Sequence, residues 1–135
     1  MSRKGKRESI RGALAGLGTF AAVYKGARRK FNGLSPVATI LSRGEESHFE
    51  TRGATAPDWQ TFRYVVTIFV RADEGAEEAA EDTLDDLRES IGPALMAIGC
   101  VLGESDAEPL GFSLRNIDGV FYRVEKIPIH IEEYT

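Results

Sequence analysis

The stretch of sequence that most constrains the fold is residues 63–72, because apolar side chains occupy both of its alternating faces. Successive side chains of a strand point to opposite faces of a sheet, so this stretch predicts a strand that is covered on both sides. One face carries Tyr64, Val66, Ile68 and Val70, and the other carries Val65, Thr67 and Phe69. We therefore place residues 63–72 at the centre of a sheet.

Residues 73–98 have the spacing of an amphipathic helix. The apolar positions share one helical face and are Ala80, Leu84, Leu87, Ile91, Leu95 and Ile98. The opposite face is acidic and consists of Glu77, Glu78, Glu81, Asp82, Asp85, Asp86 and Glu89. Gly92-Pro93 predicts a kink or a break, because proline lacks the backbone donor and its ring clashes with the carbonyl of Glu89.

The C-terminal part predicts a β-hairpin. Asp118-Gly119 is a strong signal for a two-residue type I′ turn, and apolar residues alternate on both sides of it, at 110–114 and 120–124. Further along, Ile127, Ile129 and Ile131 continue the strand on the opposite parity. Pro128 lies within that run and indicates a β-bulge or an edge position at the switch.

The N-terminal half predicts shorter elements. Residues 1–7 carry four cations and no apolar anchor, which indicates a flexible basic arm. After the arm we expect a short helix from Glu8 to Gly16 or Gly18, a strand at 20–24, a basic loop with Arg28, Arg29 and Lys30, and a strand at 36–41. Residues 42–60 show no hydrophobic period and contain turn signals, so they predict a long projecting loop.

These elements predict an α+β fold in a single domain over residues 8–135. Its sheet is expected to be mixed and largely antiparallel, with the helices packed on one face. The 135-residue length, with 42% hydrophobic and 28% charged residues, fits one globular domain with a core of its own.

The charge of the chain is unevenly distributed. Residues 1–53 contain 11 Lys and Arg against 4 Asp and Glu, whereas residues 54–135 contain 6 against 17. Such an asymmetry suits either a basic arm that reaches a polyanion or a subunit that packs head to tail against a copy of itself.

The compartment can also be predicted. No apolar run approaches the roughly 20 residues that cross a bilayer, and the basic N-terminus lacks the apolar core of a signal peptide. A single cysteine, Cys100, cannot close an intramolecular disulfide or build a multi-cysteine zinc site. We expect an unexported protein in a reducing compartment.

Residues for catalysis are few. His48 and His130 have no second His or Cys at metal-ligand spacing, and Cys100 lies in an apolar run where a buried, inert thiol is expected. The string of residues 16–21 matches G-x-G-x-x-A, but it follows a helix and precedes a strand, the reverse of a dinucleotide site. The acidic face of residues 77–89 lacks the loop pattern of a calcium site. We therefore expect no enzymatic activity, no cofactor and no metal.

Binding is the remaining class of function. The basic arm and the loop around Arg28 to Lys30 could neutralise phosphates, although no aromatic residues are interleaved there for base stacking. Trp59 in the expected loop is either a lid over the local core or an interface anchor.

The order of the expected elements resembles the tail terminator proteins of long-tailed bacteriophages, also called tail completion or neck proteins. The likeness covers most of residues 8–134 and is carried by element order and apolar pattern at 10–17, 23–26, 36–40, 62–70, 80–95 and 122–134. The family has no catalytic signature. The resemblance implies a virion structural protein, assembled in the host cytoplasm and located in the neck region of a siphophage tail.

The resemblance implies a six-membered homo-oligomeric ring at the head-proximal end of the tail tube. Such a ring stops tube polymerisation, binds the head-completion proteins, and lets DNA pass without specific binding. On this interpretation, the candidate contact residues towards neighbouring subunits or the tube are Arg28, Arg29, Lys30, His48, Phe49 and Trp59. The candidate acidic face of the ring exterior or channel is Glu78, Glu81, Asp82, Asp85, Asp86 and Glu89.

Two alternatives remain open at the level of sequence. The chain could take another neck role, as a head-closure or connector protein. It could also be a small nucleic-acid-binding module that uses the basic N-terminal arm, which predicts steep salt dependence.

Overall fold

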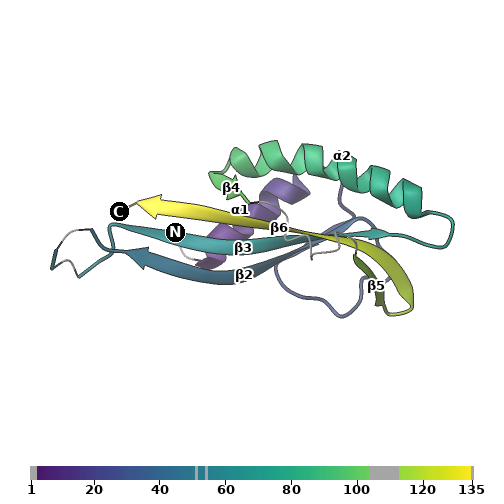
Figure 1. The fold of residues 1–135 in the computed structure, drawn as a ribbon, viewed down its shortest axis with the longest axis horizontal. Coiled ribbons are helices and arrows are strands. Elements are labelled where there is room, and N and C mark those ends of the chain that lie inside the picture. The colour runs from purple at the N-terminus through teal and green to yellow at the C-terminus, as the bar shows by residue number, and fades with distance from the viewer. Residues whose placement is uncertain (1–2, 51, 54, 104–112, 135) are drawn as a thin grey trace.

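The structure of the protein is a computed structural model that describes residues 3–50, 52–53, 55–103 and 113–134. Within these residues the chain forms two helices and a six-stranded, mostly antiparallel sheet (Figure 1). The helices are α1 (Arg3–Ala15) and α2 (Glu77–Met96). The strands are β1 (Ala22–Tyr24), β2 (Val37–His48), β3 (Trp59–Arg71), β4 (Cys100–Leu102), β5 (Ser113–Ile117) and β6 (Val120–Tyr134). The predicted α+β class is confirmed.

The sheet has the order β1-β2-β3-β6-β4, and β5 pairs with β6. The β1–β2 pair is parallel and the other pairs are antiparallel, so the predicted mixed, largely antiparallel sheet is confirmed. β3 lies in the middle of this order, as its apolar pattern predicts. The expected hairpin is also present, because Ile117 pairs with Val120 and both turn residues have positive φ, 53° at Asp118 and 82° at Gly119.

Both helices pack on one face of the sheet, which we call the helix face (Figure 1). The main core lies between them and includes Ile10 and Leu14 from α1 and Leu84, Leu87, Ile91 and Leu95 from α2. Strand β3 contributes every second residue to this core: Phe62, Tyr64, Val66, Ile68 and Val70. The predicted apolar face is therefore confirmed from Ala80 to Leu95, but it is wrong for Ile98, which lies beyond the end of α2 and is 38% exposed.

The other face of the sheet, which we call the open face, carries a smaller core at one end. Phe31 from the β1–β2 connection packs against Phe69 and Tyr122, with ring centroids 4.8 and 5.5 Å apart. Val37 and Val124 complete the cluster, and the Tyr122 hydroxyl donates a hydrogen bond to the Leu34 carbonyl. The prediction that the central strand is covered on both sides is confirmed at this end.

The second core also explains the parity switch in β6. Tyr122 and Val124 face the open-face core, whereas Ile127 and Ile129 face the main core, so the apolar side changes within one regular strand. The predicted bulge at Pro128 is wrong, because β6 pairs with β3 in one register from Trp59↔Tyr134 to Arg71↔Tyr122. The Pro128 carbonyl accepts a bond from the Gly103 amide, on the side away from β3, so the missing donor of the proline costs no bond to β3.

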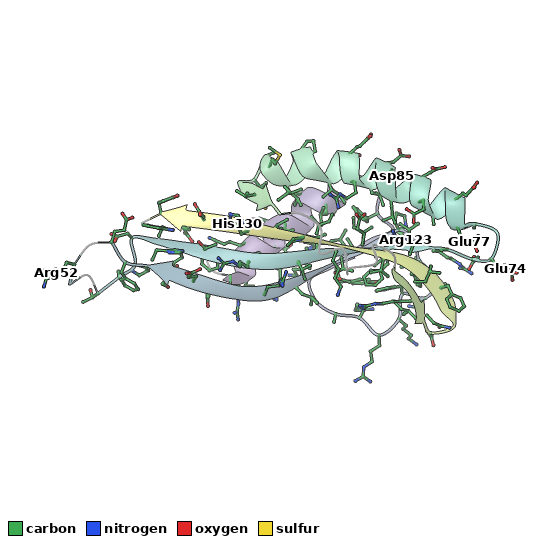
Figure 2. The ribbon with its side chains drawn as sticks, in the orientation of Figure 1. Arg52, Glu74, Glu77, Asp85, Arg123 and His130 are labelled. Carbon is green, nitrogen blue, oxygen red and sulfur yellow. The ribbon has the colours of Figure 1, made fainter. Side chains whose placement is uncertain are left out.

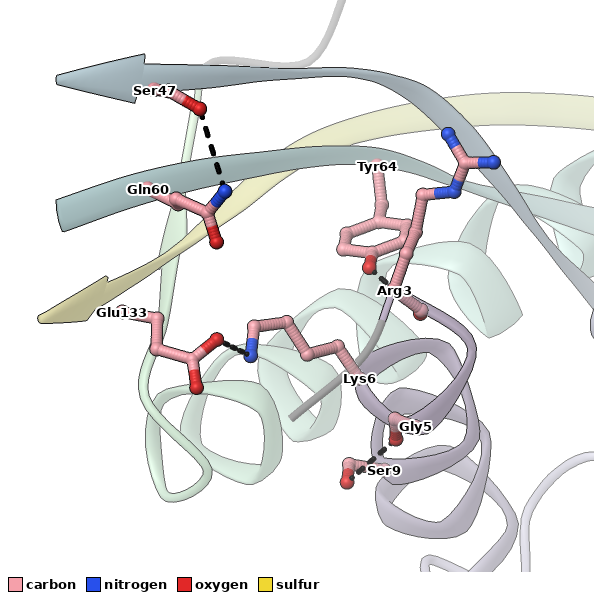
Figure 3. A network of polar contacts seen from close by, with 8 residues as sticks. All are labelled: Arg3, Gly5, Lys6, Ser9, Ser47, Gln60, Tyr64 and Glu133. Carbon is pink, nitrogen blue, oxygen red and sulfur yellow. Dashed lines mark hydrogen bonds and ion pairs between the residues drawn. The ribbon is translucent and has the colours of Figure 1, made fainter. Parts of the chain in front are cut away.

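The predicted flexible arm at residues 1–7 is wrong for the part that the structure describes, because residues 3–7 form the start of α1. Lys6 is only 4% exposed, and its ammonium group pairs with Glu133 (Figure 3). The same ammonium group lies 4.6 Å from the centroid of the Phe62 ring. The Tyr64 hydroxyl donates to the Arg3 carbonyl at 3.0 Å. The lysine stem covers apolar surface while its charged end finds a partner at the far end of the chain.

The predicted long loop at 42–60 is also wrong, because β2 runs on to His48 and β3 begins at Trp59. The two strands form a long hairpin with a register shift between Ser42 and Gly44, and the connection is residues 49–58. This hairpin projects beyond the helices (Figure 1). Its β2 side, residues 42–48, has no hydrophobic period because it contains no apolar side chain and is exposed or half-buried.

Gly92-Pro93 does not break the second helix, since α2 is one helix from Glu77 to Met96. Ile91 and Leu95 are fully buried on either side of Pro93 and hold both halves against the sheet. The expected alternation at Leu110 and Phe112 lies outside the described residues.

Candidate interaction surfaces

An acidic surface covers the side of α2 that faces away from the sheet. Asp82, Asp85, Asp86 and Glu89 are exposed there, and we call these four residues the acidic ridge. Figure 2 shows acidic side chains along this side of the helix, Asp85 among them. No ion pair to any ridge carboxylate is present within the parts of the chain that the structure describes. The ridge is a set of negative charges that the chain leaves to the solvent.

The other predicted members of the acidic face differ from the ridge. Glu81 forms an ion pair with Arg123 of β6, so it serves to hold α2 against the sheet. Glu78 is exposed in the first turn of the helix, where a carboxylate stabilises the positive end of the helix dipole. Of the six predicted positions, four therefore form the free ridge.

A groove of about 710 Å³ lies on the open face of the sheet. Its floor is formed by open-face residues of β2 and β3, including Leu41, Val65 and Thr67. One wall is the β1–β2 connection around Arg28, and the other is the β5–β6 turn around Asn116. We call this feature the basic groove because the cations that line it are Arg28, Arg29, Arg43, Arg115 and Lys126.

The electrostatic character of the basic groove is strongly positive. Asp118 is the one carboxylate among the described residues that line it. Arg28 lies over the ring of Tyr24, 4.3 Å from its centroid, which fixes the direction of its guanidinium. Arg29, Arg115 and Lys126 form no ion pair with any other residue that the structure describes. The groove can bind carboxylate or phosphate groups through charge-assisted hydrogen bonds.

The sequence predicts part of the basic groove. Arg28 and Arg29 were predicted as contact residues and line it, whereas Lys30 is exposed and does not. Arg43, Arg115 and Lys126 were missed, because they come from three other segments that only the sheet pairing brings together. The alternation of Lys126 with Ile127 was a usable signal, since it places Lys126 on the face opposite the main core.

A third surface is the aromatic end of the β2–β3 hairpin. His48 stacks on Trp59 with ring centroids 4.7 Å apart, and Trp59 lies 6.1 Å from Tyr134 of β6. The His48 ring nitrogen Nε2 is 3.0 Å from the Thr61 hydroxyl. Phe49 and Tyr134 are 56% and 71% exposed. The sequence predicts His48, Phe49 and Trp59 as contact residues. It does not predict Tyr134, because the position of Tyr134 beside Trp59 depends on the β3–β6 register.

The two interpretations of Trp59 can be compared with this geometry. Trp59 packs with His48 and Tyr134, and it is not part of either apolar core. The interpretation as a lid over a local core is therefore wrong. The interpretation as an interface anchor stays a prediction.

Of the residues considered for catalysis, His48 belongs to the aromatic end of the hairpin, whereas Cys100 and His130 lie outside the three surfaces. Burial raises the pKa of the Cys100 thiol to about 11, so the thiol is protonated at neutral pH and a poor nucleophile. His130 lies opposite Arg63 on the open face, as its alternation with Ile129 predicts. Among the described residues, no group of three or more His, Cys, Asp or Glu side chains is placed to hold a metal ion.

The glycines of the string at 16–21 follow the end of α1 at Ala15, and Gly18 has a positive φ of 70°. Their interpretation as the helix stop is confirmed. In the described part of the chain, no helix is long and apolar enough to span a bilayer. No protein-family model matches this chain, and no curated protein sequence matches it.

Proposed function

We propose that this chain is a structural virion protein of the tail-terminator type, which forms a ring on the head-proximal end of a phage tail tube. The observation that carries the proposal is that the acidic ridge and the basic groove lie on opposite sides of the molecule. The ridge is on the outer side of α2, which covers the helix face, and the groove is on the open face. A subunit with complementary surfaces on opposite sides associates head to tail, and such contacts close into a ring when the rotation between copies divides a full turn. Complementary charge also steers the encounter between copies.

The projecting hairpin supports the same function. Exposed aromatic residues are typical of protein interfaces, and here they gather beyond the part of the sheet that the helices cover. We assign this end to the tube. Phe49→Ser is then expected to leave rings intact and to abolish tube capping, with Phe121→Ser, a phenylalanine that is 50% exposed elsewhere, as its control. Capping by Phe49→Ser at the level of the unchanged chain contradicts this assignment.

In the proposed mechanism the chain performs no reaction. The ring stops addition of tube subunits by covering the surface on which the next tube ring assembles, and its second side binds the head-completion proteins. Another role in the neck, as a head-closure or connector ring, would use the same kind of subunit contact. The tube-capping assay separates these roles.

A nucleic-acid-binding module is the second candidate, and the basic groove is the observation that favours it. The N-terminal cations favour it less than the sequence suggested, because Lys6 pairs with Glu133, Arg11 with Glu8, and Arg3 lies 3.9 Å from Glu45. The groove also lacks an exposed aromatic platform for stacking bases among its described lining residues.

The experiment that tests the function is native mass measurement with negative-stain imaging over a range of protein and salt concentrations, with and without a short DNA duplex. The expected result is six-fold rings that do not bind the duplex. The rings should dissociate more readily as the salt concentration rises, because salt screens exposed charge. A monomer at every concentration contradicts a ring that assembles through the surfaces of the chain itself. Duplex binding with a steep salt slope favours the nucleic-acid module.

A further inference from the structure

We propose that the basic groove of one copy receives the acidic ridge on α2 of a second copy. This contact specifies the subunit interface of the ring and rests on the proposed function. It is a heterologous contact, because each copy offers its ridge to one neighbour and its groove to the other.

The two surfaces cannot meet within one chain. The floor of the groove is made by residues that alternate along β2, β3 and β6 with those of the main core, for example Lys126 with Ile127. The ridge lies on the far side of α2, which itself packs on the helix face. The sheet and the main core therefore separate the ridge from the groove, and only another copy can bring them together.

Several charged residues elsewhere in the described chain form ion pairs. Arg88 of α2 binds Glu125 at 2.8 Å, Arg63 binds Glu46 at 3.1 Å, and Arg71 binds Asp73 at 2.8 Å. The ridge carboxylates and three of the groove cations stay unpaired within the described residues. The two unpaired sets have opposite sign, which is the complementarity expected of two surfaces that meet.

The shapes and charges of the two surfaces also match. The ridge is the convex side of one helix, and Asp82 to Glu89 extend over about 10 Å at a rise of 1.5 Å per residue. The groove is concave and carries five cations with one carboxylate, against the four carboxylates of the ridge. Most of the cations are arginines, whose guanidinium groups bind carboxylates through two parallel hydrogen bonds.

Reciprocal charge reversal tests this contact. The groove variant is Arg29→Glu/Arg115→Glu, and the ridge variant is Asp82→Lys/Asp85→Lys. Each alone places like charges against each other, so each is expected to weaken self-association at least about tenfold, which corresponds to about 1.4 kcal/mol. An equimolar mixture of the two variants should recover association, since each acidic groove then meets a basic helix. The chain that carries all four substitutions should recover it as well.

Matched controls separate this contact from a general effect of net charge. Glu50→Lys/Glu74→Lys changes the charge as the ridge variant does, and Lys4→Glu/Arg52→Glu changes it as the groove variant does. All four positions are exposed and lie outside both surfaces. Sedimentation velocity measures association, and circular dichroism confirms that each variant is folded. The controls are expected to associate like the unchanged chain.

The outcomes distinguish this contact from the proposed function. Rings that both variants form as well as the unchanged chain overturn the contact and leave the ring function standing. Charge-dependent dimers or filaments with the rescue pattern support the contact and contradict the ring. A chain that never associates overturns both. A groove variant that loses binding of a DNA duplex, with a ridge variant that keeps it, assigns the groove to a polyanion and overturns the contact.

Discussion

The two faces of strand β3 carry different kinds of structure. On the helix face, its buried residues Phe62, Tyr64, Val66, Ile68 and Val70 form one continuous row under both helices. On the open face, apolar packing is confined to the end around Phe69, and the groove and the aromatic hairpin end occupy the rest. One strand therefore divides two tasks between its alternating residues: the helix face provides most of the stability, and the open face provides surface for binding.

The largest expected effect is that of a charge in the main core. Leu87 is 4% exposed under α2, so Leu87→Asp should lower the free energy of unfolding by more than about 4 kcal/mol and unfold much of the protein. Chemical denaturation followed by circular dichroism measures this, with Asp86→Asn, one residue away on the outer side, as a control that should be nearly neutral. A soluble Leu87→Asp variant that unfolds cooperatively with the parent stability contradicts the assignment of stability to the helix face.

A smaller effect is expected on the open face. Phe31 contacts Tyr24, Phe69 and Tyr122, and Phe31→Ala should cost about 3 kcal/mol because a buried aromatic is removed and a cavity remains. The protein should stay folded, and amide exchange should rise along the β1–β2 connection that forms one wall of the groove. Phe49→Ala, at an exposed phenylalanine, is the control. A loss below about 1 kcal/mol would show that the open-face core does not hold this wall.

Much of the fold could be predicted because local pattern and final environment agree. The central strand, the turn at Asp118-Gly119 and the buried side of α2 each have an apolar period or a turn signal that needs no knowledge of distant residues. The predictions failed where a residue is defined by a distant partner. Lys6 looked like part of an arm because Glu133, which allows its burial, is 127 residues away in the sequence.

The candidate surfaces show the same division. The acidic ridge lies on a single helix, so its spacing in the sequence predicted the shared face. The cations of the basic groove come from four separate segments, and only Arg28 and Arg29 form a local cluster in the sequence. Residues 42–48 of the β2–β3 hairpin have the pattern of a loop because they contain no apolar side chain and are exposed or half-buried, which removes the alternation that identifies a strand.

The pairing of Lys6 with Glu133 gives a test at acid pH. The hydrogen bond from Lys6 lowers the pKa of Glu133 from 4.5 to about 2 in the folded protein. A carboxyl group with a lowered folded pKa stabilises the fold above its unfolded pKa, and this contribution is lost as pH falls through the folded value. The free energy of unfolding should therefore decline between about pH 5 and pH 2, and Glu133→Gln should decline less steeply there. Glu50→Gln is the exposed control, and an acid profile of Glu133→Gln identical to that of the parent contradicts the pairing.

The smallest effect is expected at the turn that forms the second wall of the groove. Gly119 has a φ of 82°, which an L side chain adopts only with strain, and no atom lies within 4 Å of the position that a Cβ would take. Gly119→Ala should therefore lower the free energy of unfolding by about 1 kcal/mol through the backbone alone. Gly26 in the opposite wall also has open space but no positive φ, so Gly26→Ala is the matched control and should not destabilise. Equal effects of the two substitutions in urea denaturation would show that the type I′ turn does not hold the β5–β6 wall in place. A loss at Gly119 alone, with unchanged self-association, would show instead that the groove tolerates a weaker wall and that its charges dominate the binding.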